Sequence, residues 1–140
     1  LSLTNDDKEL VYGGVENGGK VGVITLATGE HRLQLNHHSN TVMSGTLTHD
    51  GEWAVTAGGN KNDLIIWSVK DGKIRHHIQT KGGPVNSVAF VATEPTIFFG
   101  EQDVGGGFLG RNPFKAAFRS DDLVVDKLPK QAKITRPEQS

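Results

Sequence analysis

The chain has 140 residues, no cysteine, and a formal net charge of −1 from 15 basic and 16 acidic side chains. This balance argues against nucleic acid or an anionic membrane surface as a partner, and the missing cysteines exclude disulfides and thiolate metal sites. No apolar run is long enough to span a bilayer, and the lack of cysteine favours a cytoplasmic location.

Along the chain, short β-branched or aromatic runs alternate with turn residues, and no segment shows the apolar period of an amphipathic helix. A shift of 43 residues places 19–35 on 62–78 and 41–47 on 84–90, with turn glycines in step and no gap. Each period holds four short strands separated by Gly, Asn, Asp or Pro. Self-similarity at roughly 40–45 residues is typical of propeller blades.

The repeat predicts a partial first blade, a second blade that matches best, a third degenerate blade and a polar segment, at 1–36, 37–80, 81–118 and 119–140. In the third blade, Gly107, Gly110 and Pro113 weaken the expected third and fourth strands. Residues 119–140 are expected either to form a tail without fixed structure or to pair "DLVVD" (122–126) with an exposed strand edge.

The stretch "SNTVMSGTLTHDGEWAVTAGGNKNDLIIWSVKDGK" (39–73) resembles a WD40 repeat, and the resemblance covers roughly residues 2–104. It shows an inner strand, an Asp-Gly turn, a second strand ending in small residues, and a third strand ending at Trp. The family's Trp-Asp pair is replaced by Trp67-Ser68, Ile24-Thr25 and Gly110-Arg111. The family's hydrogen-bonded Asp–His–Ser/Thr–Trp set has no counterpart at the usual spacing. We therefore expect blade stability to depend on packing.

The resemblance implies an all-β fold of WD40-like β-propeller blades, each a four-stranded antiparallel sheet. About three blades fit the chain, whereas rings close with roughly 4–8. We therefore expect an incomplete ring, completed by other copies or chains, or a fragment of a larger propeller. Trp53, Trp67 and Phe90 are expected to be structural, with the tryptophans packing between blades rather than forming a ligand cage.

The function implied is a non-catalytic scaffold for protein–protein interaction and complex assembly, which binds a protein or peptide partner through loop faces and uses no cofactor. The face formed by the fourth-to-first and second-to-third strand connections is rich in hydrogen-bonding groups. Its candidate binding residues are His37, His38, Asn60, Lys61, Asn62, Asp63, Lys81, Gln102 and Asp103. The opposite face uses 27–30, 49–51, 70–73 and 93–95.

Three alternatives stay open. The chain is a propeller segment of a larger multidomain enzyme or signalling protein, or an architectural subunit that pairs through exposed blade edges. In the third alternative the repeat is misleading, and the chain forms a single β-sandwich with a ligand cleft.

Two motifs suggest ligands only at first sight. "GGGFLG" (105–110) satisfies the dinucleotide-binding string, but Pro113 follows and no helix is predicted, so turn glycines are the better interpretation. Neighbouring strand residues point to opposite faces, so His76 and His77 cannot both reach one metal ion. His37-His38 is expected in a loop, and we predict no metal site.

A nucleophilic triad can be assembled on paper from Ser44, Ser87, His49 and Asp50. Neither serine lies on a strained elbow or beside a base, as such chemistry requires. In a β domain these residue types usually form turns and polar surface. We therefore predict no enzyme activity and no catalytic residue.

Overall fold

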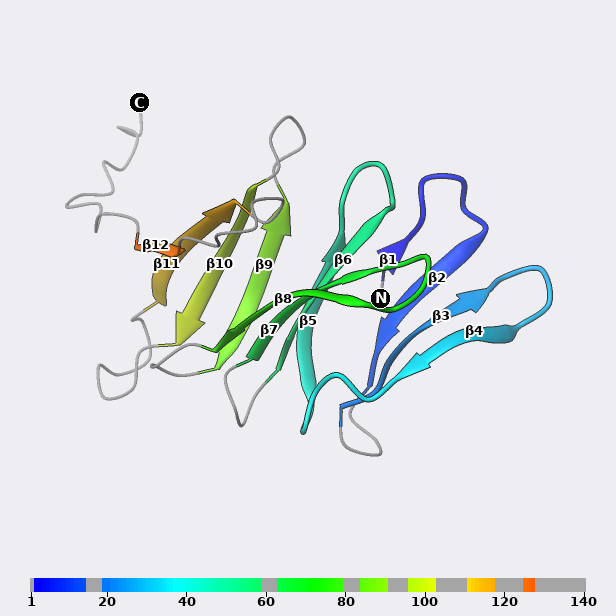
Figure 1. Cartoon of the computed structure of the whole chain (residues 1–140), viewed down its shortest axis with the longest axis horizontal. Coiled ribbons are helices and arrows are strands. Elements are labelled where there is room, and N and C mark those ends of the chain that lie inside the picture. Colours follow the sequence, from blue (N-terminus) through cyan, green and yellow to red (C-terminus); the bar gives the residue numbers. More distant parts are fainter. Residues whose placement is uncertain are drawn as a thin grey trace, which may run out of the picture.

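The computed structural model describes residues 2–14, 19–58, 63–79, 84–90, 96–102, 111–117 and 125–127. For residues 86, 101–102, 111–117 and 125–127 it gives the backbone alone. The described residues form three four-stranded sheets that stand next to one another (Figure 1). No helix occurs among them, and so none that is long and apolar enough to cross a membrane.

Each sheet is an antiparallel meander in which neighbouring strands follow one another in the sequence. Sheet A contains β1 (Ser2–Leu3), β2 (Glu9–Gly13), β3 (Val21–Thr25) and β4 (Glu30–Leu35). Sheet B contains β5 (Val42–Leu47), β6 (Trp53–Gly58), β7 (Asp63–Ser68) and β8 (Ile74–Gln79). Sheet C contains β9 (Val85–Phe90), β10 (Thr96–Gln102), β11 (Arg111–Ala117) and β12 (Val125–Lys127). The predicted all-β architecture of four-stranded blades is confirmed.

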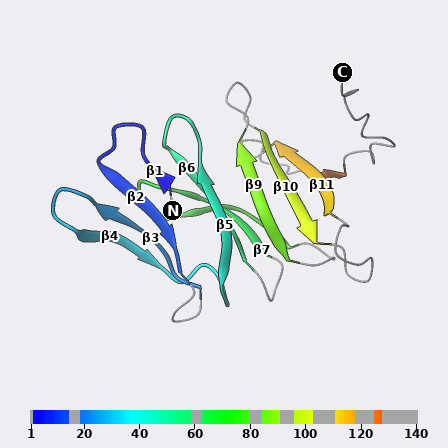
Figure 2. The ribbon, with the colours of Figure 1, turned by 180° about the vertical axis from the view of Figure 1, so that it is seen from behind.

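The first strands of the three sheets form the inner row. Strand β5 contacts both β1 and β9, and from behind it lies between sheet A and β9 (Figure 2). The fourth strands, β4, β8 and β12, are the opposite edges of their sheets. Such an arrangement packs the sheets face to face, as propeller blades do.

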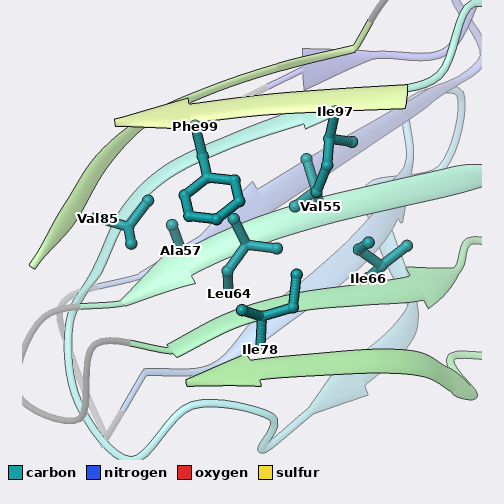
Figure 3. Close-up of a cluster of buried hydrophobic side chains, with 8 residues drawn as sticks. All are labelled: Val55, Ala57, Leu64, Ile66, Ile78, Val85, Ile97 and Phe99. Atoms are coloured by element: carbon teal, nitrogen blue, oxygen red, sulfur yellow. The ribbon is translucent and has the colours of Figure 1, made fainter. Parts of the chain in front are cut away.

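Sheet B is the centre of the structure because both of its faces are covered. Strand β7 is buried at every residue except Ser68, which explains why its sequence is a continuous apolar run rather than an alternating one. Leu64 and Ile66 point to sheet C, where they join Val55, Ala57, Ile78, Val85, Ile97 and Phe99 (Figure 3). Ile65 and Trp67 point to sheet A, where they join Val11, Val21, Val23, Ala54 and Val69. Trp53 and Phe90 are partly buried against the B–C cluster.

The first blade departs from the gapless 43-residue alignment. Thr4 and Thr48 make the same turn, since each hydroxyl bonds an Asp two residues later and each backbone N–H bonds a carbonyl five residues later. This equivalence corresponds to a shift of 44 residues. Beyond the β2–β3 connection the shift is 43, because Leu26 and Val69 both donate to the preceding turn. The gapless 43-residue shift, when it is extended to place 9–16 on 52–59, is therefore wrong by one residue over β2, and the extra residue lies between β2 and β3.

The third blade also corrects two expectations. Pro113 does not interrupt β11, which pairs with β10 from Arg111 to Ala117. Among the described residues, β12 pairs with 114–116 and no second strand pairs with Pro113, a position that tolerates a missing N–H. Ala116 in β11 is the counterpart of Trp67 in β7. Trp67 pairs with Ala54, the second residue of β6, and Ala116 pairs with Ile97, the second residue of β10.

The predicted pair Gly110-Arg111 is therefore wrong, because the β10–β11 connection is longer than its counterpart in sheet B. Residues 103–110, which include "GGGFLG", lie in that connection and outside the described residues. For residues 119–140 the sequence left two alternatives, a tail without fixed structure or a strand that pairs with an exposed edge. Residues 125–127 form β12, which pairs with β11 of the same chain.

Candidate functional site

Two of the residues predicted for a binding face lie between β4 and β5 and are used inside the fold. His37 is half-buried, with its Nε2 2.8 Å from the carbonyl oxygen of Gly72 and its ring edge-on to Trp67 at a centroid distance of 5.8 Å. Burial lowers the pKa of His37, and the bond to Gly72 partly opposes that shift. His37 thus ties this connection to the β7–β8 turn.

His38 is more deeply placed, at 3% exposure. Its Nε2 lies 2.7 Å from the hydroxyl oxygen of Thr56, and that oxygen accepts the indole N–H of Trp67 at 3.2 Å. Burial lowers the pKa of His38 to about 4, although the charge of Asp63 acts in the opposite direction. The ring is therefore neutral at pH 7.

The direction of the bond between the Thr56 hydroxyl and Nε2 of His38 depends on the tautomer of the ring, and Nδ1 of His38 is buried without a hydrogen-bond partner among the described residues. Gly58 leaves room for that nitrogen, since a Cβ there would lie 2.7 Å from it. The expectation that the family's hydrogen-bonded set is missing from the second blade is corrected for three of its four members, because His38, Thr56 and Trp67 are in place; an Asp bonded to Nδ1 of His38 is not found among the described residues. The sequence prediction rested only on the absence of an Asp in the turn at Lys61-Asn62, and these three residues lie elsewhere.

Asp63 begins β7 and is buried. Its Oδ1 lies 2.9 Å from Nε2 of His77 on the adjacent strand β8, whose side chain is half exposed. Asp63 therefore joins the ends of β7 and β8, and its carboxylate is not presented to a partner.

The other predicted binding residues receive less structural information. Gln102 ends β10, and its backbone alone is described. The rest lie outside the described residues: Asn60, Lys61, Asn62, Lys81 and Asp103. The loop face remains a prediction for these residues.

A cleft with a volume of ≈ 470 Å³ lies at the junction of sheets A and B, beside the β5–β6 and β7–β8 turns. These turns belong to the predicted face that lies opposite the one with the candidate binding residues. The lining residues come from both sheets: Glu9, Arg32, Asp50, Gly51, Glu52, Trp53, Ser68, Val69 and Lys70.

Arg32 forms one wall of the cleft and joins the two sheets. From β4 its guanidinium donates to both carboxylate oxygens of Glu9 in the same sheet. It also donates to the carbonyl oxygens of Val69 at 2.9 Å and Lys70 at 3.0 Å in sheet B. A planar group with several fixed donors can satisfy this combination, whereas an ammonium group cannot.

The opposite wall is a turn stabilised by its own side chains. Asp50 accepts from the Thr48 hydroxyl and, at 2.9 Å, from the backbone N–H of Glu52. The Thr48 hydroxyl oxygen in turn accepts the N–H of Trp53 at 3.0 Å. These bonds hold Asp50 as a turn former, so the turn presents the exposed side chain of Glu52 on a fixed backbone.

The cleft combines a mostly apolar lining with exposed charged side chains. Glu52 and Lys70, both exposed, supply opposite charges from two different turns. Within the described ranges, no three His, Cys, Asp or Glu side chains come together in a group that could hold a metal ion. The signals that could have located this cleft are the repeated Thr-x-Asp turns at residues 4 and 48 and the position of Arg32 in the outer strand.

Comparison with protein-family models gave no match, and comparison with curated proteins gave none either. Among solved structures, the β-propeller domain of Myceliophteria thermophila Cps50 (Swd1) is similar, with a TM-score of 0.76 and 19% identity over 99% of this chain. The RRP9 WD40 repeats match with a TM-score of 0.76 and 14% identity over 90%. Kuenenia stuttgartiensis hydrazine synthase matches with a TM-score of 0.74 and 15% identity over 91%.

The chain spans 39%, 36% and 36% of the lengths of these three proteins. At such low identity the similarity concerns the fold, and it agrees with the order, pairing and packing of the strands. The chain has the fold of the WD40 β-propeller, and the residues that the structure describes form three of its blades.

Proposed function

We propose that the protein is a non-catalytic scaffold for protein–protein interaction, and that it binds an extended segment of a protein partner in the cleft between sheets A and B. The observation that carries this proposal is the construction of the cleft from two sheets that Arg32 fastens together. A binding surface placed on a rigid framework loses little entropy when a partner docks.

The mostly apolar lining of the cleft, together with the charges beside it, suits a peptide segment. The exposed charges of the cleft are a carboxylate at Glu52 and an ammonium at Lys70, which suit a segment carrying charges of both signs. The overall charge of −1 gives no reason to expect nucleic acid or an anionic membrane as the partner.

A scaffold role without chemistry of its own is supported by the role of Asp50. Its carboxylate is engaged in the turn beside His49, so it is poorly placed to orient a catalytic histidine. One similar structure is an enzyme by its name, hydrazine synthase, so the fold alone does not decide the matter.

The test is selection of peptides from a random library on the purified chain, followed by affinity measurement with single variants. Glu52→Lys and Lys70→Glu should each weaken the selected peptides by about tenfold or more, equivalent to about 1.4 kcal/mol. Glu30→Lys is the matched control, because Glu30 is exposed and does not line the cleft.

A failure to select any peptide, or equal affinity for all three variants, would contradict the proposal. The predicted loop face is tested in the same series by Lys61→Ala. Asp63 is unsuitable for that test, because its loss would also remove the bond to His77.

A further inference from the structure

The charges that line the cleft between sheets A and B are not equally available to a partner. Three carboxylates and two cationic side chains line it, so its walls carry one excess negative charge. The carboxylate of Glu9 receives bonds on both oxygens from the guanidinium of Arg32, whose other bonds go to backbone carbonyl groups of sheet B. These two charges satisfy each other within the wall and offer little to a ligand.

Lys70 and Glu52 stand on opposite turns and differ in their surroundings. Lys70 has an acidic neighbour in its own turn, Asp71, whose pKa is lowered chiefly by the backbone N–H of Lys73 and also by the charge of Lys70. The carboxylate of Glu52, by contrast, has no hydrogen-bond or ion-pair partner in the part of the chain that the structure describes. Glu52 is therefore the stronger attractor for a charge on the partner.

The backbone holds Glu52 in place and directs its side chain over the cleft. The N–H of Glu52 donates to Asp50 at 2.9 Å, and its carbonyl oxygen accepts the N–H of Val69 at 3.0 Å. Glu52 stands two residues before Ala54, whose side chain packs toward sheet A, so extended backbone places both side chains on the same side. The space beside Glu52 is open, since a Cβ on Gly51 would meet no atom within 4 Å.

A long side chain with an apolar stem and a cationic head matches this arrangement. The lining is mostly apolar, and the carboxylate of Glu52 is exposed beside it. Lysine and arginine lay their stems on apolar surface while their heads keep polar partners. A partner's Asp or Glu has a short stem and would be repelled by the excess negative charge. Arginine fits better than lysine, because a guanidinium gives two parallel bonds to one carboxylate.

We propose that the cleft selects partner segments by a basic side chain, arginine in preference to lysine, whose stem lies on the apolar lining and whose head binds Glu52. This inference rests on the proposed function and adds to it the residue type that decides which segments the cleft accepts.

The test selects peptides on the full chain from three random libraries of equal size, with the central position fixed as Arg, Gln or Glu. The Arg library should give about tenfold more binders than either of the others. On the variant Glu52→Arg the preference should reverse, so that the Glu library gives the most binders. Glu30→Arg is the matched control, because Glu30 is exposed outside the cleft and its change should leave the preference for Arg unaltered.

Two kinds of failure are distinguishable. Equal numbers of binders from the three libraries, or a preference for Arg that persists in Glu52→Arg, would overturn this inference but not peptide binding itself. The absence of binders from all three libraries would overturn the proposed function as well. Glu52→Gln, which removes the charge and keeps the size, should lose the preference for Arg without gaining one for Glu, and circular dichroism checks that each variant is folded.

Discussion

Thr56 is the residue through which the polar set of sheet B is most directly tested. Replacing it by valine keeps the size and β-branching of the side chain but removes the hydroxyl. The indole N–H of Trp67 and Nε2 of His38 then lose their partner, at 0% and 3% exposure. A buried polar group without a partner costs about 1–3 kcal/mol, and the added methyl group returns part of that. We expect Thr56→Val to lower the free energy of unfolding by about 2–4 kcal/mol.

The assay is urea unfolding at pH 7, followed by far-UV circular dichroism so that changes in tryptophan fluorescence do not confuse the comparison. Thr46→Val is the matched control, because Thr46 is half-buried in β5 and does not belong to the set. Its cost should stay within about 0.5 kcal/mol.

A double-mutant cycle separates the hydrogen bonds from packing. Trp67→Phe removes the indole donor, so Thr56→Val should cost less in that background, with a coupling of about 1 kcal/mol or more. If the two changes add independently, or if Thr56→Val costs no more than Thr46→Val, the set does not stabilise the blade. Packing alone would then be sufficient, as the sequence suggested.

Three further predictions follow from individual residues. The pKa of His38 falls from 6.5 to about 4 on folding, so the unfolded chain binds a proton that the native chain does not. The contribution of neutral His38 to the free energy of unfolding is therefore fully present above pH 6.5 and is lost as the pH falls toward 4. The loss should reach about 2 kcal/mol at pH 5; His38→Gln should remove it from urea unfolding curves, whereas His49→Gln should not. Arg32→Lys should lower the free energy of unfolding, measured by thermal denaturation, by about 1–2 kcal/mol. The reason is that an ammonium group cannot reach a carboxylate and two carbonyl oxygens together. Asp7→Gly should raise the free energy of unfolding slightly, by less than about 1 kcal/mol, and so raise the urea midpoint. The reason is that Asp7 has φ 55° at the turn position that Gly51 occupies in sheet B. A lower urea midpoint would argue against strain at Asp7.

The fold was predictable because the period is carried by turn chemistry as well as by apolar strands. Gly29 and Gly72 occupy the same turn with positive φ, and the run Leu64 to Trp67 marks a strand buried on both faces. The register of β2 was not predictable. Its small and apolar residues fit β6 at either of two shifts, and a one-residue slip exchanges the two faces of a strand.

The polar contacts were harder to predict because they join segments that are irregular or far apart. His38 lies in a connection, Thr56 in the middle of a strand, and Trp67 near the end of the next strand. Nothing in the local sequence of Thr56 distinguishes it from an ordinary strand threonine. The cleft depends likewise on how far the Arg32 side chain extends over the carbonyl groups of sheet B, and no sequence period specifies that reach.

The two junctions of sheet B differ in chemistry, and this difference links stability to binding. In the part of the chain that the structure describes, the B–C cluster is apolar, whereas the A–B junction adds the bonds of Arg32, His37 and His38 to its apolar contacts. Polar contacts respond to acid, so the A–B junction should loosen first as the pH falls. A peptide in the cleft would contact both sheets at this junction and would stabilise it by mass action. A selected peptide should therefore raise the melting temperature, and Glu52→Lys should abolish that shift without changing the melting temperature of the free protein.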